Sequence, residues 1–294
     1  RWTQMKKLSM TKYLYLLFIC VVFANCTLTD NDQPLPAYLE ITDVNISTNQ
    51  FQGDPTHKIS DVWAYADNQL LGVFELPCKI PILTNGESTE FLIFPGFRNN
   101  GERSRSFTYN VMDQLKFTET LAPGDVIQKS LTFSYKAEAK FDFIEGFEGG
   151  SHIFTRDLDD DESTRIIATT EDKKSGAQSG KILLTEENSN ISVASIFDYN
   201  RIDNAGLDSY FEMDYKNDIP FFVGALYQQE GKLVSQPLIL LNPSEEWNKI
   251  YIDFTSILSS PLLDKYTVYI TTDLETLSGS TGTIYLDNLK FVHL

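Results

Sequence analysis

Short hydrophobic runs separated by turn formers make up the chain from Ala37 to about residue 138. Within each run β-branched and aromatic residues are frequent, and none sustains an apolar stripe over three helical turns, so the pattern predicts strands. Asp67, Asn68 and Gln69 separate two of the runs and indicate a tight hairpin turn. The runs are YLEITDVNI, DVWAYA, LLGVFEL, EFLIFPGF, SFTYNVM and KSLTFSYK.

About a hundred residues in six to eight strands is the size of an immunoglobulin-like β-sandwich. We therefore expect an antiparallel sandwich over 36–138. Glycines and prolines at its turns serve backbone geometry, and we interpret them as structural. These residues are Gly72, Pro77, Gly86, Pro95 and Gly96.

A second strand-rich pattern begins near Phe141, after the connector AEAK. Four of its pieces, in order, resemble the galactose-binding-like jelly rolls that are common in carbohydrate-binding modules and their noncatalytic relatives. The pieces are FIEGFEGG at 143–150, KKSGAQSGKILL at 173–184, EEWNKIYIDFT at 245–255 and GTIYLDNLKFV at 282–292. The resemblance implies a jelly-roll domain over 140–294, and the fold class is then all-β with two antiparallel β-sandwiches.

The same resemblance implies a structural calcium site. In that family an acidic residue of the first strand and the Asp of the last strand help to bind Ca²⁺, which points to Glu148 and Asp287. Calcium takes six to eight oxygen ligands, so carboxylates and backbone carbonyls suit it. The alternative is that Glu148 is solvated and Asp287 only hydrogen-bonds a turn.

The N-terminal residues have the pattern of a signal peptide. A short basic segment, KKLSMTK, precedes an uncharged stretch of twelve residues from Tyr13 to Ala24. A helical membrane span needs about 20 residues, so this stretch has the length of a signal-peptide hydrophobic region. We predict a signal peptide over 1–25.

VFANC, ending at Cys26, resembles the lipobox of bacterial lipoproteins, in which the cysteine carries acyl chains. Phe23 and Asn25 depart from the commonest pattern, and such relaxed boxes resemble those of Bacteroides and Flavobacterium surface lipoproteins. The resemblance implies lipidation of Cys26, an acidic tether over 26–35 and a lipid-anchored protein on the cell-surface side of the outer membrane. The alternatives are an ordinary secretory signal cut elsewhere and an uncleaved anchor.

Charge and cysteine content narrow the function further. The formal charge is −17, and the part of the chain after the uncharged stretch 13–24 carries 20 Lys and Arg against 41 Asp and Glu. Such a surface repels phosphate backbones, which argues against nucleic acid as a partner. With Cys20 removed and Cys26 acylated, Cys78 has no disulfide partner, and its apolar neighbours predict a buried thiol.

Motifs of catalysis and of metal binding are missing from the sequence. There is no G-x-S-x-G, H-E-x-x-H, P-loop or G-x-G-x-x-G, and the three histidines are far apart. The acidic run DLDDDESTR from Asp157 has Glu162 where the EF-hand frame needs Gly, so we interpret it as a solvated loop. Glycoside hydrolysis would need a specific pair of carboxylates, which no motif selects. We predict a protein that is not an enzyme.

Sugar binding would need exposed aromatic rings, because a ring face stacks on the apolar face of a pyranose. Trp63 and Trp247 sit in strand patterns that suggest burial. Phe154, Tyr199 and Tyr227 lie in or near expected loops and are the candidate platform, with a place in the core or at its rim as the alternative for each.

These observations favour a noncatalytic envelope lipoprotein that binds or assembles with other envelope proteins. The alternative is a glycan-binding surface lipoprotein that captures polysaccharide for a partner transporter or enzyme. The two differ in a visible feature: a glycan binder needs exposed aromatic rings on one shallow face, and a partner subunit needs an exposed apolar patch or an unpaired strand edge.

Overall fold

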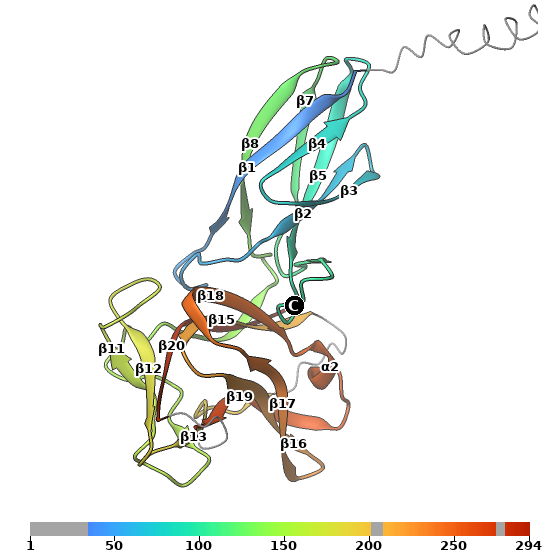
Figure 1. Ribbon diagram of the computed structural model, residues 1–294. Helices are drawn as coiled ribbons and strands as arrows, with labels where there is room; N and C mark the ends of the chain where they lie inside the picture. Colours follow the sequence, from blue (N-terminus) through green and yellow to red (C-terminus); the bar gives the residue numbers. More distant parts are fainter. Residues whose placement is uncertain (1–34, 201–207, 275–279) are drawn as a thin grey trace, which may run out of the picture.

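The computed structural model describes residues 35–200, 208–274 and 280–294, which are folded almost wholly into β-strands (Figure 1). The helix α2, Thr255–Leu258, is a single turn. The all-β prediction is confirmed. Within the described ranges no helix is both long and apolar enough to cross a bilayer. The predicted signal peptide and the predicted lipidation site Cys26 lie outside these ranges.

The N-terminal sandwich is built from two sheets. The first has the order β4 (Cys78–Ile82), β1 (Ala37–Ser47), β8 (Val126–Ser134). The second has the order β3 (Gln69–Glu75), β2 (Asp61–Ala66), β5 (Ser88–Phe97), β6 (Phe107–Thr108), and β7 (Leu115–Thr120) also pairs with β5. Fully buried side chains of both sheets, among them Leu39, Ile41, Val62, Phe91 and Phe133, form one core.

Strands β1 and β8 run parallel, with Tyr38 beside Val126 and Ser47 beside Ser134. The other described ladders between these strands are antiparallel, so β1–β8 departs from the expectation of a purely antiparallel sandwich. The alternation of apolar and polar residues tells which face a strand buries. It carries no information on the direction of the neighbouring strand.

The hairpin between β2 and β3 closes on two residues. Asp67 and Asn68 both have positive φ, 47° and 64°, and Gln69 already begins β3. Two consecutive positive φ values are the signature of the tight turn whose twist matches paired strands, and Asn and Asp tolerate them best. The predicted turn at this place is therefore confirmed, and it is one residue shorter than the signal suggested.

The C-terminal sandwich also has two sheets, here called the far sheet and the docking sheet. The far sheet has the order β10 (Arg156–Asp157), β13 (Asn190–Ala194), β19 (Leu263–Asp273), β16 (Phe221–Gln229), β17 (Lys232–Leu241), and β14 (Tyr199–Asn200) pairs with β19. The docking sheet has the order β11 (Ile167–Thr169), β12 (Ser179–Thr185), β20 (Thr281–His293), β15 (Ser209–Asn217), β18 (Ser244–Asp253), and β9 (Lys140–Glu145) pairs with β20.

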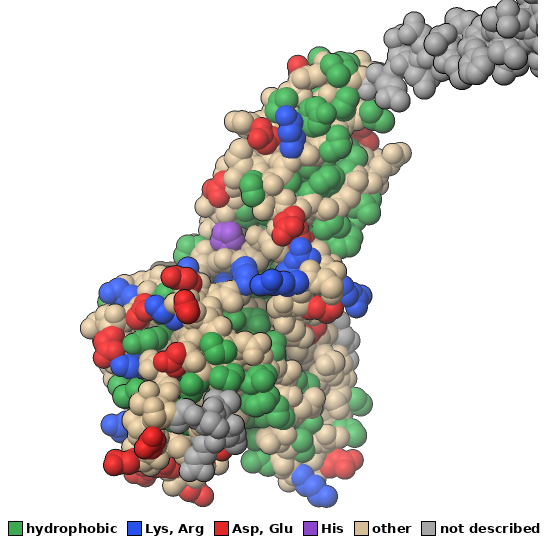
Figure 2. Space-filling view, in the orientation of Figure 1, with side chains coloured by type: hydrophobic (Ala, Val, Ile, Leu, Met, Phe, Trp, Pro, Cys, Tyr) green, Lys and Arg blue, Asp and Glu red, His purple; other side chains and the backbone are tan. Residues whose placement is uncertain are grey.

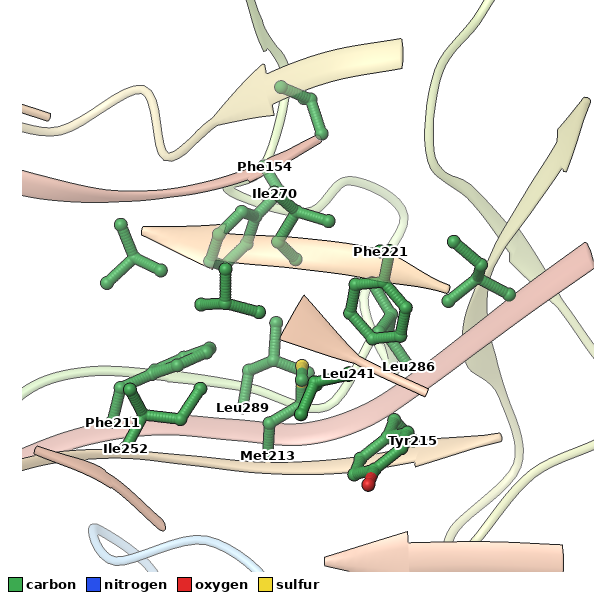
Figure 3. Close-up of a cluster of buried hydrophobic side chains, with 14 of the residues drawn as sticks. Phe154, Phe211, Met213, Tyr215, Phe221, Leu241, Ile252, Ile270, Leu286 and Leu289 are labelled. Carbon is green, nitrogen blue, oxygen red and sulfur yellow. The ribbon is translucent and has the colours of Figure 1, made fainter. Parts of the chain in front are cut away.

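Apolar side chains from the two sheets meet in the core of this sandwich (Figure 3). Phe211 and Met213 project from β15 of the docking sheet, and Phe221 and Ile270 project from the far sheet. All four are fully buried. Their burial fixes the direction of the alternate residues of β15, which must face outward.

The N-terminal sandwich stands on the outer face of the docking sheet, over β15, β18 and β20 (Figure 1). Tyr210, Tyr251 and Val292 of the docking sheet belong to the core of the N-terminal sandwich. The ring of Phe97 lies 5.2 Å from that of Tyr210 and 5.3 Å from that of Tyr251. As a result β15 is buried on both faces, and part of the outer face of the docking sheet is closed to ligands.

Candidate functional site

The outer face of the docking sheet is divided into two parts. The covered half is buried next to the N-terminal sandwich and comprises Tyr210, Glu212, Asp214, Lys249, Tyr251, Lys290 and Val292. The open strip lies farther along the same face, is half-buried, and comprises Lys181, Tyr285, Lys216 and Trp247. A ligand can reach the open strip without separating the two sandwiches.

The open strip follows from strand register. Lys181 on β12 and Lys216 on β15 both stand opposite Tyr285 on β20, so these side chains are neighbours across three strands. Ile284 and Leu286 point into the core, which turns Tyr285 outward. Trp247 lies on the next strand, β18, where the pairing with β15 shifts register. Trp247 alternates with the core residues Ile250 and Ile252 and therefore points to the same outer face as Tyr251.

Two carboxylates from the connection between β11 and β12 hold the open strip together. Asp172 accepts a hydrogen bond of 2.8 Å from the indole of Trp247 and pairs with the ammonium of Lys216 at 2.7 Å. Glu171 pairs with the ammonium of Lys181 at 2.5 Å and accepts a hydrogen bond of 3.2 Å from the hydroxyl of Tyr285. The rings of Trp247 and Tyr285 lie 6.5 Å apart at 51°.

These contacts keep the carboxylates charged. Burial raises the pKa of Asp172, but hydrogen bonds from Lys216 and Trp247 outweigh it and lower the pKa overall. The hydrogen bond from Lys181 lowers the pKa of Glu171, and in return Glu171 raises the pKa of Lys181. At neutral pH the open strip therefore presents two ion pairs that alternate with two aromatic rings.

A hollow of about 240 Å³ adjoins the open strip. Lys216 and Tyr285 form one side of it, and the other side comes from Asp218, Ser244, Glu245 and Thr283. Hydroxyl, amide and carboxylate groups of this kind donate and accept hydrogen bonds at the edge of the aromatic rings. The strip and its hollow can thus hold a ligand that is apolar on one face and carries hydroxyl groups along its edge.

The open strip lacks the side chains that catalysis usually needs. It contains no histidine, cysteine or serine beside a general base, and the described residues include no group of three or more His, Cys, Asp or Glu placed to hold a metal ion.

Acidic side chains are spread over the visible face of the C-terminal sandwich (Figure 2), as the composition of the chain implies.

The two residues predicted to bind calcium are brought to one place. Glu148 and Asp287 both line a cavity of about 190 Å³ at the loop 174–178. Glu148 accepts hydrogen bonds of 2.7 and 3.0 Å from the backbone N–H groups of Ala177 and Gln178. Asp287 accepts bonds of 2.9 and 3.1 Å from those of Lys174 and Ser175. The carboxylates hold the loop by its N–H groups.

This arrangement does not fit a calcium ion as it stands. Oε1 of Glu148 and Oδ2 of Asp287 each accept two backbone N–H donors, and the buried ammonium of Lys290 lines the same cavity. Burial also raises the pKa of Asp287 to about 6. Calcium binding stays a prediction, which metal analysis of the wild type and of Glu148→Ala would test.

Phe154, predicted as a ligand platform, is a core residue. Its side chain is fully buried, and its ring packs edge-to-face against Phe143 at 5.8 Å. The prediction was wrong because a residue outside a regular strand can still fill the core. In the segment that precedes β10, Phe154 closes the sandwich at its end.

Tyr199 and Tyr227 lie on either side of Tyr266, each paired with it in register across β14, β19 and β16. Both are half-buried and pack against the core of the C-terminal sandwich. The ring of Tyr199 lies 5.4 Å from that of Phe143, and the hydroxyl of Tyr227 hydrogen-bonds to Gln236 at 3.1 Å. They are rim aromatics of the far sheet and do not join the open strip.

The two tryptophans differ from the expectation of burial, because both are only half-buried. The indole of Trp63 donates to Ser106 in the N-terminal sandwich at 3.1 Å. Trp247 belongs to the open strip. Tyr285, which sequence reasoning missed, could have been found from alternation, since it stands between two core residues in GTIYLDNL. Trp247 follows the same alternation on β18, because Lys249 and Tyr251 point to the outer face and Ile250 and Ile252 point to the core.

The acidic run forms a loop as expected, and the thiol of Cys78 is less buried than predicted. Asp157 accepts hydrogen bonds from the backbone N–H groups of Asp159 and Asp160, so the run folds on itself as a loop. Cys78 is a free, half-buried cysteine on β4, where burial raises the pKa of the thiol.

No protein-family model matches the chain, and no curated protein matches its sequence significantly. Among solved structures, the chain is similar to carbohydrate-binding modules. A xylan-binding domain of a family 22 module is 15% identical, with 53% of this chain and 96% of that one covered and a TM-score of 0.38. A xylan-binding domain from Paenibacillus barcinonensis is 13% identical, with 53% and 95% covered and a TM-score of 0.38.

A family 29 module complexed with mannohexaose is 14% identical, with 53% of this chain and 92% of that one covered and a TM-score of 0.32. What these modules bind is a property of those proteins. The function of this chain is therefore argued from its own residues.

Proposed function

We propose that the protein is a noncatalytic saccharide-binding protein whose open strip takes a chain of several sugar residues. One observation carries the proposal: Lys181, Tyr285, Lys216 and Trp247 form a row across four neighbouring strands, with aromatic rings and ion-paired groups in one line. This combination matches a sugar chain, which has apolar ring faces and hydroxyl edges.

The dimensions of the open strip support a chain rather than a single ring. Neighbouring strands are about 4.8 Å apart, so a row across four strands is about 14 Å long. The strip adjoins the hollow that Lys216 and Tyr285 help to line. Because Glu171 and Asp172 tie the polar groups to the sheet, little side-chain freedom would be lost on binding.

The test is the affinity for soluble polysaccharides, measured by affinity electrophoresis and calorimetry on the wild type and on Trp247→Ala and Tyr285→Ala. We expect each substitution to weaken binding at least about tenfold, or about 1.4 kcal/mol. Phe51→Ala is the matched control, because Phe51 is an aromatic residue that is 73% exposed on the N-terminal sandwich. Equal affinities of all four proteins would refute the proposal.

We also propose that acyl chains on Cys26 hold the protein at the outer membrane, where it would capture polysaccharide for a partner transporter or enzyme. Two or more acyl chains are needed for stable anchoring. The mass and membrane fractionation of Cys26→Ala test this step. Unchanged fractionation would remove the anchor and leave saccharide binding untouched.

One further observation favours a second candidate, binding to another envelope protein. Strand β17 is at the edge of the far sheet, and it exposes Leu233 by 64% and Leu240 by 45%. An exposed apolar edge can accept a strand of a partner. Loss of a co-purifying envelope protein in Leu233→Lys with polysaccharide binding kept would support this function, and retention of the partner would refute it.

A further inference from the structure

Strand β3, Gln69–Glu75, is at the edge of the second sheet of the N-terminal sandwich, where it pairs with β2 (Figure 1). The N–H of Leu76 donates to the carbonyl of Ser60, which precedes β2, at 3.0 Å. Antiparallel pairs alternate between hydrogen-bonded and non-hydrogen-bonded, so the backbone groups of Glu75 and Val73 point away from β2. Among the residues that the structure describes, these groups have no hydrogen-bond partner. They are free to pair with a further strand.

Strand β3 lacks the residues that protect sheet edges from further pairing. Its sequence, QLLGVFE, contains no Lys, Arg or Pro. Every other edge strand of more than three residues in the described ranges contains at least one of them. Lys and Pro at an edge oppose the addition of a strand, so their absence marks β3 as an edge open to pairing. The residues in the other edge strands are Lys79 and Pro81 of β4, Lys116 of β7, Lys129 of β8, Lys140 of β9, Lys232 and Pro237 of β17, and Lys249 of β18.

An apolar surface lies beside this edge, on the outer face of the same sheet. Val62 and Ala64 are core residues, which turns the alternate residues of β2 outward. The outer face then carries two rows of apolar and aromatic side chains, each of which crosses three strands. At the edge, Leu70 is 51% exposed and Val73 is 42% exposed, so the side chains of an added strand would pack beside them. The rows are Val73, Trp63 and Phe94, and Leu70, Tyr65 and Leu92.

The charge around β3 indicates which kind of segment fits it. From Ile59 to Cys78 the chain contains three carboxylates and no Lys or Arg. Asp61 pairs with Arg98 at 3.3 Å, which leaves the exposed Asp67 and Glu75 near the two ends of the strand. Cationic groups at both ends of a partner segment would complement these carboxylates. A second copy of this chain has no cation to offer from the same region, so a different protein is favoured.

We propose that β3 accepts an extended segment of a partner protein, which has apolar side chains at alternate positions and Lys or Arg at both ends. Main-chain hydrogen bonds to Val73 and Glu75 would provide affinity, and side-chain contacts with Leu70 and Val73 would provide selectivity. This interaction surface goes beyond the proposed function, because it lies on the N-terminal sandwich and needs neither the open strip nor β17.

The test uses the full chain and, as the probe, the peptide Lys-Val-Thr-Val-Thr-Val-Lys with blocked ends. NMR titration measures the affinity, and amide hydrogen exchange locates the bound peptide. We expect the N–H groups of Val73 and Glu75 to exchange at least about tenfold more slowly with peptide bound, because an added strand protects them. A peptide with Glu in place of Lys and a peptide with methylated backbone amides should each bind at least about tenfold more weakly.

A substitution on the protein side tests the same edge. Val73→Pro removes an outward N–H group and leaves the groups that bond to β2, so it should weaken peptide binding at least about tenfold. Val73→Thr is the matched control, because it keeps both the N–H group and a β-branched side chain, and it should bind as the wild type does. Thermal unfolding shows whether Val73→Pro is folded, and the three peptides test the wild type independently of it.

Several results would overturn the inference. They are no binding of the cationic peptide to the wild type, equal affinity for the three peptides, and undiminished binding by a folded Val73→Pro. Loss of peptide binding in Leu233→Lys alone would assign the peptide to β17. Slow exchange of Val73 and Glu75 that depends on protein concentration without peptide would make a second copy the occupant, and it too would overturn the inference. Polysaccharide binding, measured in parallel, depends on Trp247, so a failure of the proposed function is distinguished from a failure of this edge.

Discussion

The covered half and the open strip are parts of one sheet face, and they are made of the same kinds of residues. Each contains lysines, carboxylates and aromatic rings. In the covered half, Lys249 lies 3.1 Å from Glu212 and 3.7 Å from Asp214, and these side chains are at most 3% exposed. In the open strip the corresponding pairs border solvent. The same kinds of residues therefore form the interface between the two sandwiches where they are buried. Where they border solvent, they leave a surface that a ligand can reach.

Groups of the N-terminal sandwich complete the covered half. The hydroxyls of Tyr109 and Tyr135 donate to Glu212 at 2.6 and 2.5 Å, and that of Thr56 donates to Asp214 at 2.5 Å. The ammonium of Lys290 donates to the backbone carbonyls of Gln52 and Asp54. A buried charge is tolerated when it is paired and hydrogen-bonded, so the two sandwiches depend on each other for stability.

The largest difference between the halves is expected from removing a lysine. Lys249→Ala removes the cation that pairs with the buried carboxylates Glu212 and Asp214, and it should lower the free energy of unfolding by about 3–5 kcal/mol. Lys216→Ala, the matched change in the open strip, should cost about 0–1 kcal/mol because its ion pair is exposed to solvent. Urea denaturation measures both. Equal losses would erase the distinction between the halves.

A smaller difference is expected from removing a tyrosine hydroxyl. Tyr109→Phe takes a hydrogen bond from the buried carboxylate of Glu212, which should cost about 1.5–3 kcal/mol of stability. Tyr285→Phe removes a hydroxyl whose bond to Glu171 is at the surface, and thermal unfolding should barely change. If Tyr109→Phe proved neutral, the hydrogen bond from Tyr135 would be sufficient for Glu212, and the bond from Tyr109 would not be needed for stability.

Binding should respond in the opposite order. Trp247→Ala should weaken polysaccharide binding at least about tenfold, or about 1.4 kcal/mol, while Lys249→Met in the covered half should leave the affinity of the folded fraction unchanged. Calorimetry at a temperature where both variants are folded checks this contrast. Loss of affinity in Lys249→Met would show that the ligand also depends on the joint.

The last expected effect is a pH dependence of stability in the covered half. Burial lowers the pKa of Lys290 to about 8, below its unfolded value of about 10.5. Between these values the unfolded chain binds more protons, so Lys290 should make stability rise as pH increases from about 8 toward 10. Urea midpoints at about pH 7.5 and about pH 9.5 would show the rise in the wild type; a similar rise in Lys290→Met would assign it to other groups.

The sequence predicted the elements better than the sites. Alternation identified the strands, and Asp67 and Asn68 marked a hairpin turn, because both signals arise from local backbone geometry. Glu148 and Asp287 were expected to lie together, and they line one cavity. The alternative that Asp287 hydrogen-bonds a turn agrees with its bonds to the loop 174–178, whereas Glu148 was expected to be solvated in that alternative and instead accepts from the same loop. Phe154 was misjudged because its burial depends on the segment that closes the sandwich end.

By itself, the sequence determined that the chain forms β-strands and which side chains of β15 face the core, since Phe211, Met213 and Tyr215 alternate with polar residues. Only the tertiary structure decided that Glu212 and Asp214, on the other face of that strand, are buried too. A period of two residues separates the faces of a strand, and it carries no information on what covers them. That covering comes from a domain more than seventy residues earlier in the chain, and where it ends, the open strip begins.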